Sequence, residues 1–130
     1  MLQNPFGIDP IRLFGDYMKV TGVPQLADAT SPDPALAGKK LGLVNGSAWI
    51  TLWCNYFGKA ILPGVKLVNV GNEGVQLNFM RAHHAGEPCP PQVNIDLSGN
   101  YAKDLVDLVH VDAVMITCST MNRAYTQVSA

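Results

Sequence analysis

The sequence predicts an α/β fold, a three-layer unit in which helices cover a parallel sheet. Short aliphatic and β-branched runs alternate with longer amphipathic segments, in the order strand, helix, strand, loop, helix, strand. Turns rich in glycine, asparagine and proline separate several of these segments. This order implies a parallel sheet with right-handed crossovers, and 130 residues suit one domain with a modest core.

The first strand, helix and second strand are expected at residues 40–45, 48–61 and 65–71. Both strand segments are short apolar runs, which end in Asn45 and Gly71. In residues 48–61, aromatic and aliphatic side chains recur at spacings of three and four, which predicts a helix.

The second half of the chain begins with residues 72–96, which show no clear long element. Part of this segment fits either a helical turn or a short strand, and we expect the segment to be the mobile part of the molecule. A helix is expected over residues 98–110, with Ser98 or Asn100 as its N-cap. Residues 112–120 then predict a buried strand.

The N-terminal residues differ in pattern from the rest. Residues 9–22 combine a possible N-cap, Asp9, with apolar side chains at helical spacing, which predicts a short amphipathic helix. A small, polar, proline-containing stretch follows and predicts a linker. We therefore expect residues 1–39 to be an extension that packs on the sheet or on a neighbouring copy, and residues 40–130 to be the α/β lobe.

Composition narrows the class of function. Charged residues make up 15% of the chain and the formal net charge is −1, which disfavours nucleic acid and membrane surfaces as partners and favours a small molecule. No apolar run reaches the ~20 residues of a membrane span, and the start lacks the features of a signal peptide, so we expect a cytoplasmic protein. The three cysteines, Cys54, Cys89 and Cys118, are widely spaced, so a special cysteine would act as a thiol.

Two loops are expected to meet at one edge of the sheet. Asn45, Gly46 and Ser47 follow the first strand, whereas Thr117, Cys118, Ser119 and Thr120 follow the last. Ligands of parallel sheets bind outside the carboxyl ends of the strands. Each loop also begins a helix, where unpaired N–H groups favour a carboxylate and a thiolate. The sequence therefore predicts an anion site with a nucleophilic Cys118.

Two segments of the chain resemble the aspartate/glutamate racemase superfamily. ITCSTMN, residues 116–122, is similar to a family pattern in which a strand ends in a cysteine followed by hydroxyl or amide residues. NGSAWITLWCNYF, residues 45–57, is similar to the GGMSWEST segment that follows the family's first strand. The residues kept are Gly46, Trp49, Thr51 and Tyr56, while Asn45 and Ile50 replace a glycine and a glutamate. The resemblance covers roughly residues 40–125.

The resemblance implies a cofactor-independent isomerase, without a metal, that acts on a small carboxylate such as an amino acid or a related acid. In the family, two α/β lobes each offer one cysteine; one thiolate removes the Cα proton and the opposite thiol returns one. Hydantoin racemases, maleate isomerases and arylmalonate decarboxylases share the architecture but use the cysteine differently. Cys118 would be catalytic, and the substrate would be bound by Asn45, Gly46, Ser47, Thr117, Ser119, Thr120 and Asn122.

The length of the chain suggests one incomplete lobe of this architecture. Only one cysteine of the pair is expected, because Cys54 lies inside the first predicted helix and Cys89 lies in a proline-rich stretch. A homo-oligomer or a missing second lobe would supply the opposing acid, and an unpaired sheet edge also favours assembly. The alternative is a non-catalytic carboxylate-binding or assembly module that retains one lobe.

Simpler structural interpretations stay open beside the functional ones. Cys118 also fits a small apolar residue that ends a strand, and residues 45–47 also fit an ordinary turn. His83, His84 and Cys89 suggest metal ligands, but adjacent histidines point in different directions, so solvated loop histidines fit better. The aromatic residues of the first helix are expected to pack in a core or an interface. A nucleotide-binding unit is disfavoured because the first loop lacks the GxGxxG spacing.

Overall fold

The computed structural model describes residues 7, 9, 12–13, 15–17 and 33–128. Residues 12–13 and 15–17 are helical, in agreement with the helix predicted over residues 9–22. The other residues of that helix, and most of the predicted linker, lie outside the described residues. The α/β unit begins with a turn that leads into the sheet.

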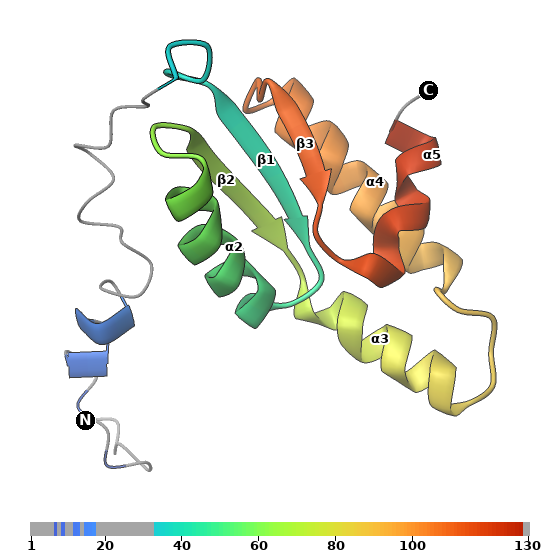
Figure 1. Cartoon of the computed structure of the whole chain (residues 1–130). Coiled ribbons are helices and arrows are strands. Elements are labelled where there is room, and N and C mark those ends of the chain that lie inside the picture. Colours follow the sequence, from blue (N-terminus) through green and yellow to red (C-terminus); the bar gives the residue numbers. More distant parts are fainter. Residues whose placement is uncertain (1–6, 8, 10–11, 14, 18–32, 129–130) are drawn as a thin grey trace.

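A three-stranded parallel sheet forms the centre of the molecule (Figure 1). The strands are β1 (Lys40–Asn45), β2 (Lys66–Gly71) and β3 (Ala113–Ile116), in the spatial order β2-β1-β3. β1 pairs with β2 over its full length, and Leu41 to Val44 pair with β3. Because all pairs are parallel, the three carboxyl ends lie at the same edge of the sheet.

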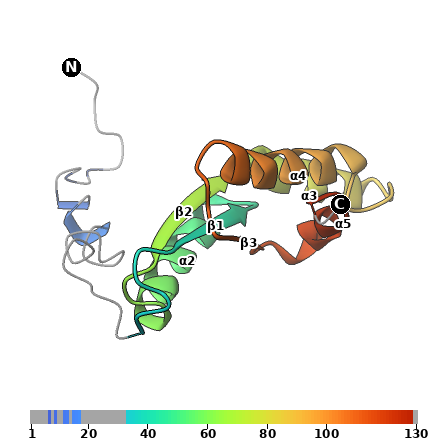
Figure 2. The same ribbon diagram turned by 90° about the horizontal axis from the view of Figure 1, so that it is seen from above.

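Helices cover both faces of this sheet and complete the predicted three-layer α/β unit. α2 (Ala48–Ile61) packs on β1 and β2, while α4 (Gln92–Asp107) lies on the opposite face (Figure 2). α3 (Glu73–His84) follows the carboxyl end of β2, and the 3-10 helix η2 (Ser119–Ala124) and α5 (Tyr125–Val128) follow β3. None of the described helices combines the length and the apolar character that a membrane crossing needs.

The main apolar core lies between the sheet and α4. Val44, Ala102 and Leu105 are buried at its centre. Around them pack Val68, Val70, Tyr101, Val109, Val111, Val114 and Ile116. Gly42 lets α4 approach closely, because a Cβ at this position would lie 2.9 Å from Leu105 Cδ1.

The prediction for residues 72–96 is wrong, because helices occupy most of this segment. α3 begins directly after β2, with Asn72 as its N-cap, whose side chain accepts a hydrogen bond from Gly74 N (2.8 Å). α4 begins at Gln92, six residues before the predicted start, so that Ser98 and Asn100 lie inside the helix and do not cap it. The apolar pattern of α3 is weak, since only Val75 and Ala82 are buried in it.

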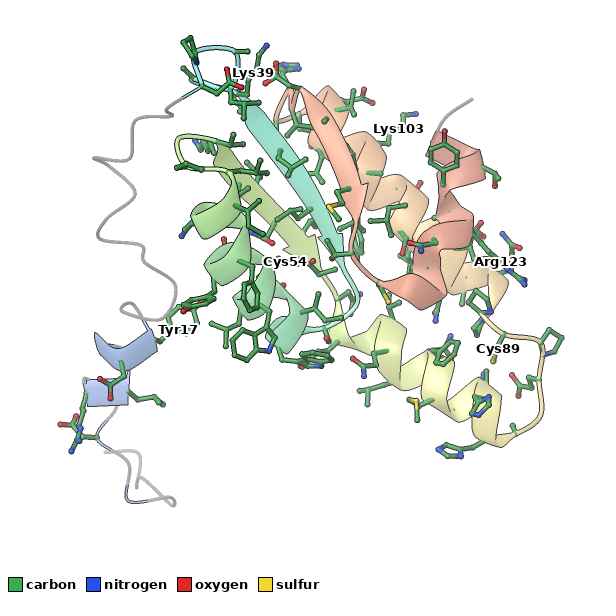
Figure 3. The ribbon with its side chains drawn as sticks, viewed as in Figure 1. Tyr17, Lys39, Cys54, Cys89, Lys103 and Arg123 are labelled. Carbon is green, nitrogen blue, oxygen red and sulfur yellow. The ribbon has the colours of Figure 1, made fainter. Side chains whose placement is uncertain are left out.

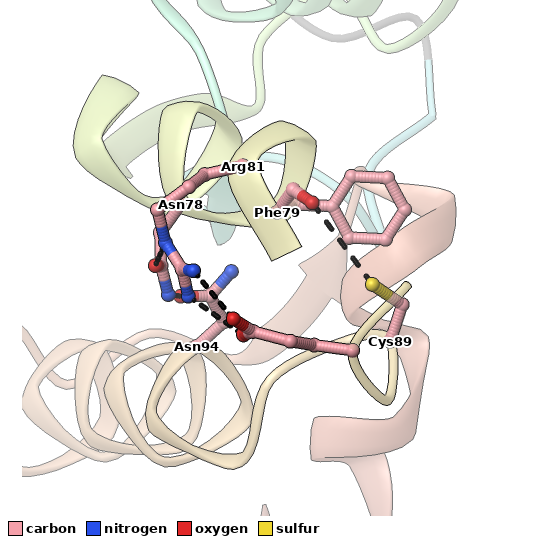
Figure 4. Close-up of polar contacts among 6 residues, drawn as sticks. Asn78, Phe79, Arg81, Cys89 and Asn94 are labelled. Atoms are coloured by element: carbon pink, nitrogen blue, oxygen red, sulfur yellow. Dashed lines mark hydrogen bonds and ion pairs between the residues drawn. The ribbon is translucent and has the colours of Figure 1, made fainter. Parts of the chain in front are cut away.

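Side-chain contacts fasten α3 to α4 and to the connection between these helices (Figure 4). The buried Asn94 of α4 donates through Nδ2 to Val75 O (2.8 Å) and accepts from Asn78 Nδ2 (2.9 Å). Arg81 donates to both carboxylate oxygens of Glu87, at 2.7 and 2.9 Å. These links order the segment that the sequence led us to expect as mobile.

β3 is half-exposed, whereas the sequence predicts a buried strand. Val114 and Ile116 face the α4 core, but the alternate residues Ala113 and Met115 are exposed, Met115 to 55%. α2 covers β1 and β2 on that side of the sheet. The strand also ends at Ile116, before the predicted end at residue 120.

Candidate functional site

The two predicted loops lie where the strand order reverses. From β1 the chain passes through α2 to β2 on one side, and it later passes through α4 to β3 on the other side of β1. The carboxyl ends of β1 and β3 therefore flank the point at which open α/β sheets bind their ligands. Asn45–Ser47 leaves β1 at this point, and Thr117–Cys118 leaves β3.

The Cys118 thiol packs against the backbone of Gly46. A Cβ added to Gly46 would lie 2.9 Å from Cys118 Sγ and 3.5 Å from Cys118 Cβ. The loop after β3 is held by Thr117 N, which donates to Val44 O (3.0 Å). A side chain at position 46 would force the Cys118 thiol to shift, and the predicted contact between the two loops is confirmed.

Asn45 is buried and uses its amide for contacts within the protein. Its Nδ2 donates to Thr51 Oγ1 (2.9 Å) and to Asn69 Oδ1 (2.9 Å), and its Oδ1 accepts from Thr117 Oγ1. The sequence predicted a substrate-binding role for this side chain. In the structure it instead connects the end of β1 to the residue before Cys118.

Two further asparagines extend this polar network and were not anticipated from the sequence. Asn69 of β2 donates through Nδ2 to Asn55 Oδ1 (3.1 Å), and Asn55 of α2 donates through Nδ2 to Thr51 O (3.0 Å). The network joins β1, β2 and α2 beneath the loop that carries Cys118. It fixes the start of α2 relative to the sheet.

Ser47 holds an unusual position at the N-terminus of α2. It is the N-cap residue and is buried, but its side chain makes no capping hydrogen bond. Ser47 Oγ has no hydrogen-bond partner among the described residues. The first turn of α2 contains no acidic side chain. This helix end therefore presents two kinds of hydrogen-bond donor. One is the Ser47 hydroxyl, which has no acceptor among the described residues, and the other is the set of N–H groups in the first helical turn, which favour an anion.

A groove of about 630 Å³ opens beside Cys118, within the usual size range of small-molecule sites. Its walls come from α2, α3 and the loop after β3. The lining residues are Trp49, Ile50, Trp53, Cys54, Phe57, Val75, Gln76, Phe79, Met80, Thr117 and Cys118. No charged side chain is among these described residues. The groove thus places the thiol in a largely apolar surrounding.

Sequence reasoning missed several features of this groove. Cys54 lies on α2 and lines the groove together with Cys118, whereas Cys89 lies in the connection between α3 and α4 (Figure 3). Trp49 and Trp53 were expected to pack in a core or an interface; they are 56% and 46% exposed and so are not part of the core of this chain. Their spacing of one helical turn on the amphipathic helix was a signal for an aromatic wall. The opposite wall could not be anticipated, because α3 was not predicted.

The remaining predicted residues are less informative about the site. Ser119 and Thr120 begin η2, but their side chains lie outside the described ones; Asn122 is exposed and does not line the groove. His83 and His84 lie in the last turn of α3 rather than in a loop, and the His83 ring stacks on Phe79 at 6.2 Å. Across the described part of the chain, no three His, Cys, Asp or Glu residues are grouped to hold a metal ion.

Comparisons with known proteins add no relative. No family model matches the chain, and neither the curated proteins nor the solved structures include a match.

Proposed function

We propose that the protein is a cofactor-independent isomerase of the aspartate/glutamate racemase type, which acts on a small carboxylic acid through the Cys118 thiolate. The observation that carries this proposal is the position of the Cys118 thiol. It packs on Gly46 at the reversal of strand order, beside the N-terminus of α2 and within an open groove.

The N-terminus of α2 supports the assignment of a carboxylate. Its first N–H groups and the positive end of its dipole attract an anion. The Ser47 hydroxyl at this helix end is buried and has no hydrogen-bond partner among the described residues, so it is a further donor beside the groove, although Ser47 itself does not line the groove. Trp49 and Ile50 of the same helical turn line the groove, so that an acid at this helix end has room for its other substituents.

The chemistry is a proton transfer at Cα. The thiolate takes the Cα proton, the C–H bond breaks, and its electron pair moves into a Cα–C double bond with the charge on the carboxylate oxygens. Donors at the helix N-terminus stabilise that charge. Return of the proton from Cys118 restores the same configuration, whereas inversion requires an acid on the opposite face. A second lobe or a second copy of the chain would supply that acid.

The test is isotope exchange in heavy water with a panel of small amino and hydroxy acids. We expect slow deuterium incorporation at Cα, measured by NMR, and none in Cys118→Ser, because a serine hydroxyl is not ionised there. Cys89→Ser is the matched control, since Cys89 does not line the groove, and should retain exchange. Absence of exchange with every acid, together with no protection of Cys118 from iodoacetamide by any of them, would contradict the proposal.

A carboxylate-binding or assembly module is the second candidate. The exposed apolar side chains of α2 favour it, because such surfaces recruit partners. Under either function we propose a homo-oligomer or a partner lobe, with no nucleic acid or membrane. We also propose a reducing compartment such as the cytoplasm, where a thiol stays reduced. Exchange activity that is lost in Cys118→Ser separates the enzyme from the module.

A further inference from the structure

The groove beside Cys118 is lined mainly by apolar side chains. Aromatic and aliphatic walls come from two helices, and the residues concerned are Trp49, Trp53 and Phe57 of α2 with Phe79 and Met80 of α3. Gln76 and Thr117 supply the polar side chains other than the thiols, and no Lys, Arg or His lines the described groove. A second carboxylate placed along these walls would give up part of its hydration without gaining a cation, which disfavours it.

The direction of the groove follows from helix geometry. Trp49, Trp53 and Phe57 are successive at a spacing of four residues, so they form one stripe along α2. At 1.5 Å per residue, this stripe extends about 12 Å away from the N-terminus of the helix. Cys54 lies roughly 10 Å from the Ser47 N-cap along the same axis. A molecule whose carboxylate sits at the helix N-terminus can therefore lay an apolar group along the stripe, toward Cys54.

We propose that the acid bound here is a monocarboxylate whose remaining substituent is an aryl or bulky apolar group, and that dicarboxylates are disfavoured. This inference rests on the proposed function and names the substrate class of the same site. Burial of a ring against Trp53 and Phe79 gains apolar contact and favourable ring geometry. The aromatic walls therefore act as the specificity-determining surface.

The positions of the three cysteines provide the experiment. On the full 130-residue chain, the iodoacetamide alkylation rates of Cys118, Cys54 and Cys89 are followed by mass spectrometry. The probes are acetate, adipate and 3-phenylpropanoate. We expect 3-phenylpropanoate to slow the reaction of both groove cysteines, at a concentration about tenfold or more below that at which acetate slows Cys118 alone. Cys89 should be unaffected by every acid.

Matched variants test the role of the aromatic wall. Trp53 lines the groove and is 46% exposed, whereas Tyr125 of α5 lies outside the lining and is 66% exposed. Trp53→Ala should bring the concentration of 3-phenylpropanoate needed for protection close to that of acetate. Tyr125→Ala should leave it unchanged. Both variants remove an exposed aromatic side chain, so a general effect on folding would appear in both.

Each other outcome is decisive. If adipate protects Cys118 as strongly as 3-phenylpropanoate does, the proposed substrate class is wrong, but the carboxylate site is not contradicted. No protection of Cys118 by any acid would overturn both the substrate class and the proposed function. Slower alkylation of Cys54 with rising protein concentration, without effect of acids on it, would show that a second copy covers the groove and would overturn the inference.

Discussion

Thr117 Oγ1 donates a hydrogen bond to Asn45 Oδ1, and this contact ties the loop that carries Cys118 to the end of the central strand. The amide of Asn45 also donates to Thr51 and Asn69, so that one side chain links four segments of the chain. The site is therefore positioned by an amide whose two N–H donors are both used within the protein.

Asn45→Ala should lower the free energy of unfolding by about 2–3 kcal/mol, because the variant loses the three part-buried hydrogen bonds that the buried Asn45 amide makes. Chemical denaturation in urea measures this loss. Asn100→Ala is the matched control: Asn100 is exposed on α4, and its replacement should change stability by less than about 0.5 kcal/mol. Equal effects of the two substitutions would show that the network does not hold the site.

Gly46→Ala should destabilise the protein through a clash with Cys118. The new Cβ would lie 2.9 Å from Sγ, and we expect a cost of about 1–3 kcal/mol. The backbone of Gly46 is not in the left-handed region, so the cost is steric and not conformational. In a Cys118→Ala background the nearest contact becomes the Cβ at 3.5 Å, and the cost should nearly disappear. A double-mutant cycle measures the coupling; additive effects would exclude the contact.

Ser47→Ala should weaken the binding of carboxylic acids and leave the stability of the protein almost unchanged. An N-cap serine replaced by alanine usually costs about 0.5–2 kcal/mol, but Ser47 makes no capping bond and its hydroxyl is unsatisfied. We expect the free energy of unfolding to stay within about 0.5 kcal/mol or to rise. Protection of Cys118 by carboxylic acids should nevertheless weaken, because a donor is removed. A stability loss typical of a cap, with unchanged protection, would contradict the assignment of Ser47 to the anion site.

The ion pair between Lys39 and Asp112, which lies at the amino ends of β1 and β3, should make the stability of the protein depend on pH. The Lys39 ammonium, which donates to Asp112 at 2.8 Å, holds the pKa of that carboxyl below its ordinary value, with help from Lys40 N. The same contact raises the pKa of Lys39. The contribution of Asp112 to the free energy of unfolding is thus complete above the pKa of this group in the unfolded chain, about 3.9. It is lost as the pH falls through the lower pKa of the folded protein. The contribution of Lys39 to the free energy of unfolding is complete below its unfolded pKa of about 10.4. It is lost as the pH rises through the higher pKa of Lys39 in the folded protein.

Asp112→Asn tests this dependence. Urea midpoints of the variant and the wild type should converge as the pH falls from 6 to below the folded pKa of Asp112, and the difference at pH 6 should shrink in high salt. Asp104→Asn, at an exposed position of α4, is the control for the change in net charge. Identical pH profiles of Asp112→Asn and the wild type would show that the ion pair contributes nothing.

The elements with a strong apolar period could be predicted from the sequence. Residues 40–45 and 48–61 match β1 and α2, because one element is an apolar run and the other carries an apolar face against the sheet. α3 could not be predicted in this way, since it extends beyond the sheet and buries only Val75 and Ala82. A helix with so little buried surface has no apolar stripe to recognise.

The site was predictable only in part, for a related reason. The rule that ligands bind at the carboxyl ends of strands was sufficient to bring Gly46 and Cys118 together. One hydrogen-bond partner of Asn45 is Asn69, 24 residues away, and this pairing depends on a strand register that no local pattern encodes. The groove likewise needs α3 as its second wall, so its apolar character became visible only in three dimensions.

The chain contains two tryptophans, Trp49 and Trp53, and both line the groove. Intrinsic tryptophan emission is therefore a built-in optical reporter of this one surface, and it needs no label. The emission wavelength and the quenching by acrylamide report how exposed the groove is to water. The core between the sheet and α4 contains no tryptophan and does not contribute to the signal. A spectrum that changes before the circular dichroism does would mark local opening of the site ahead of global unfolding.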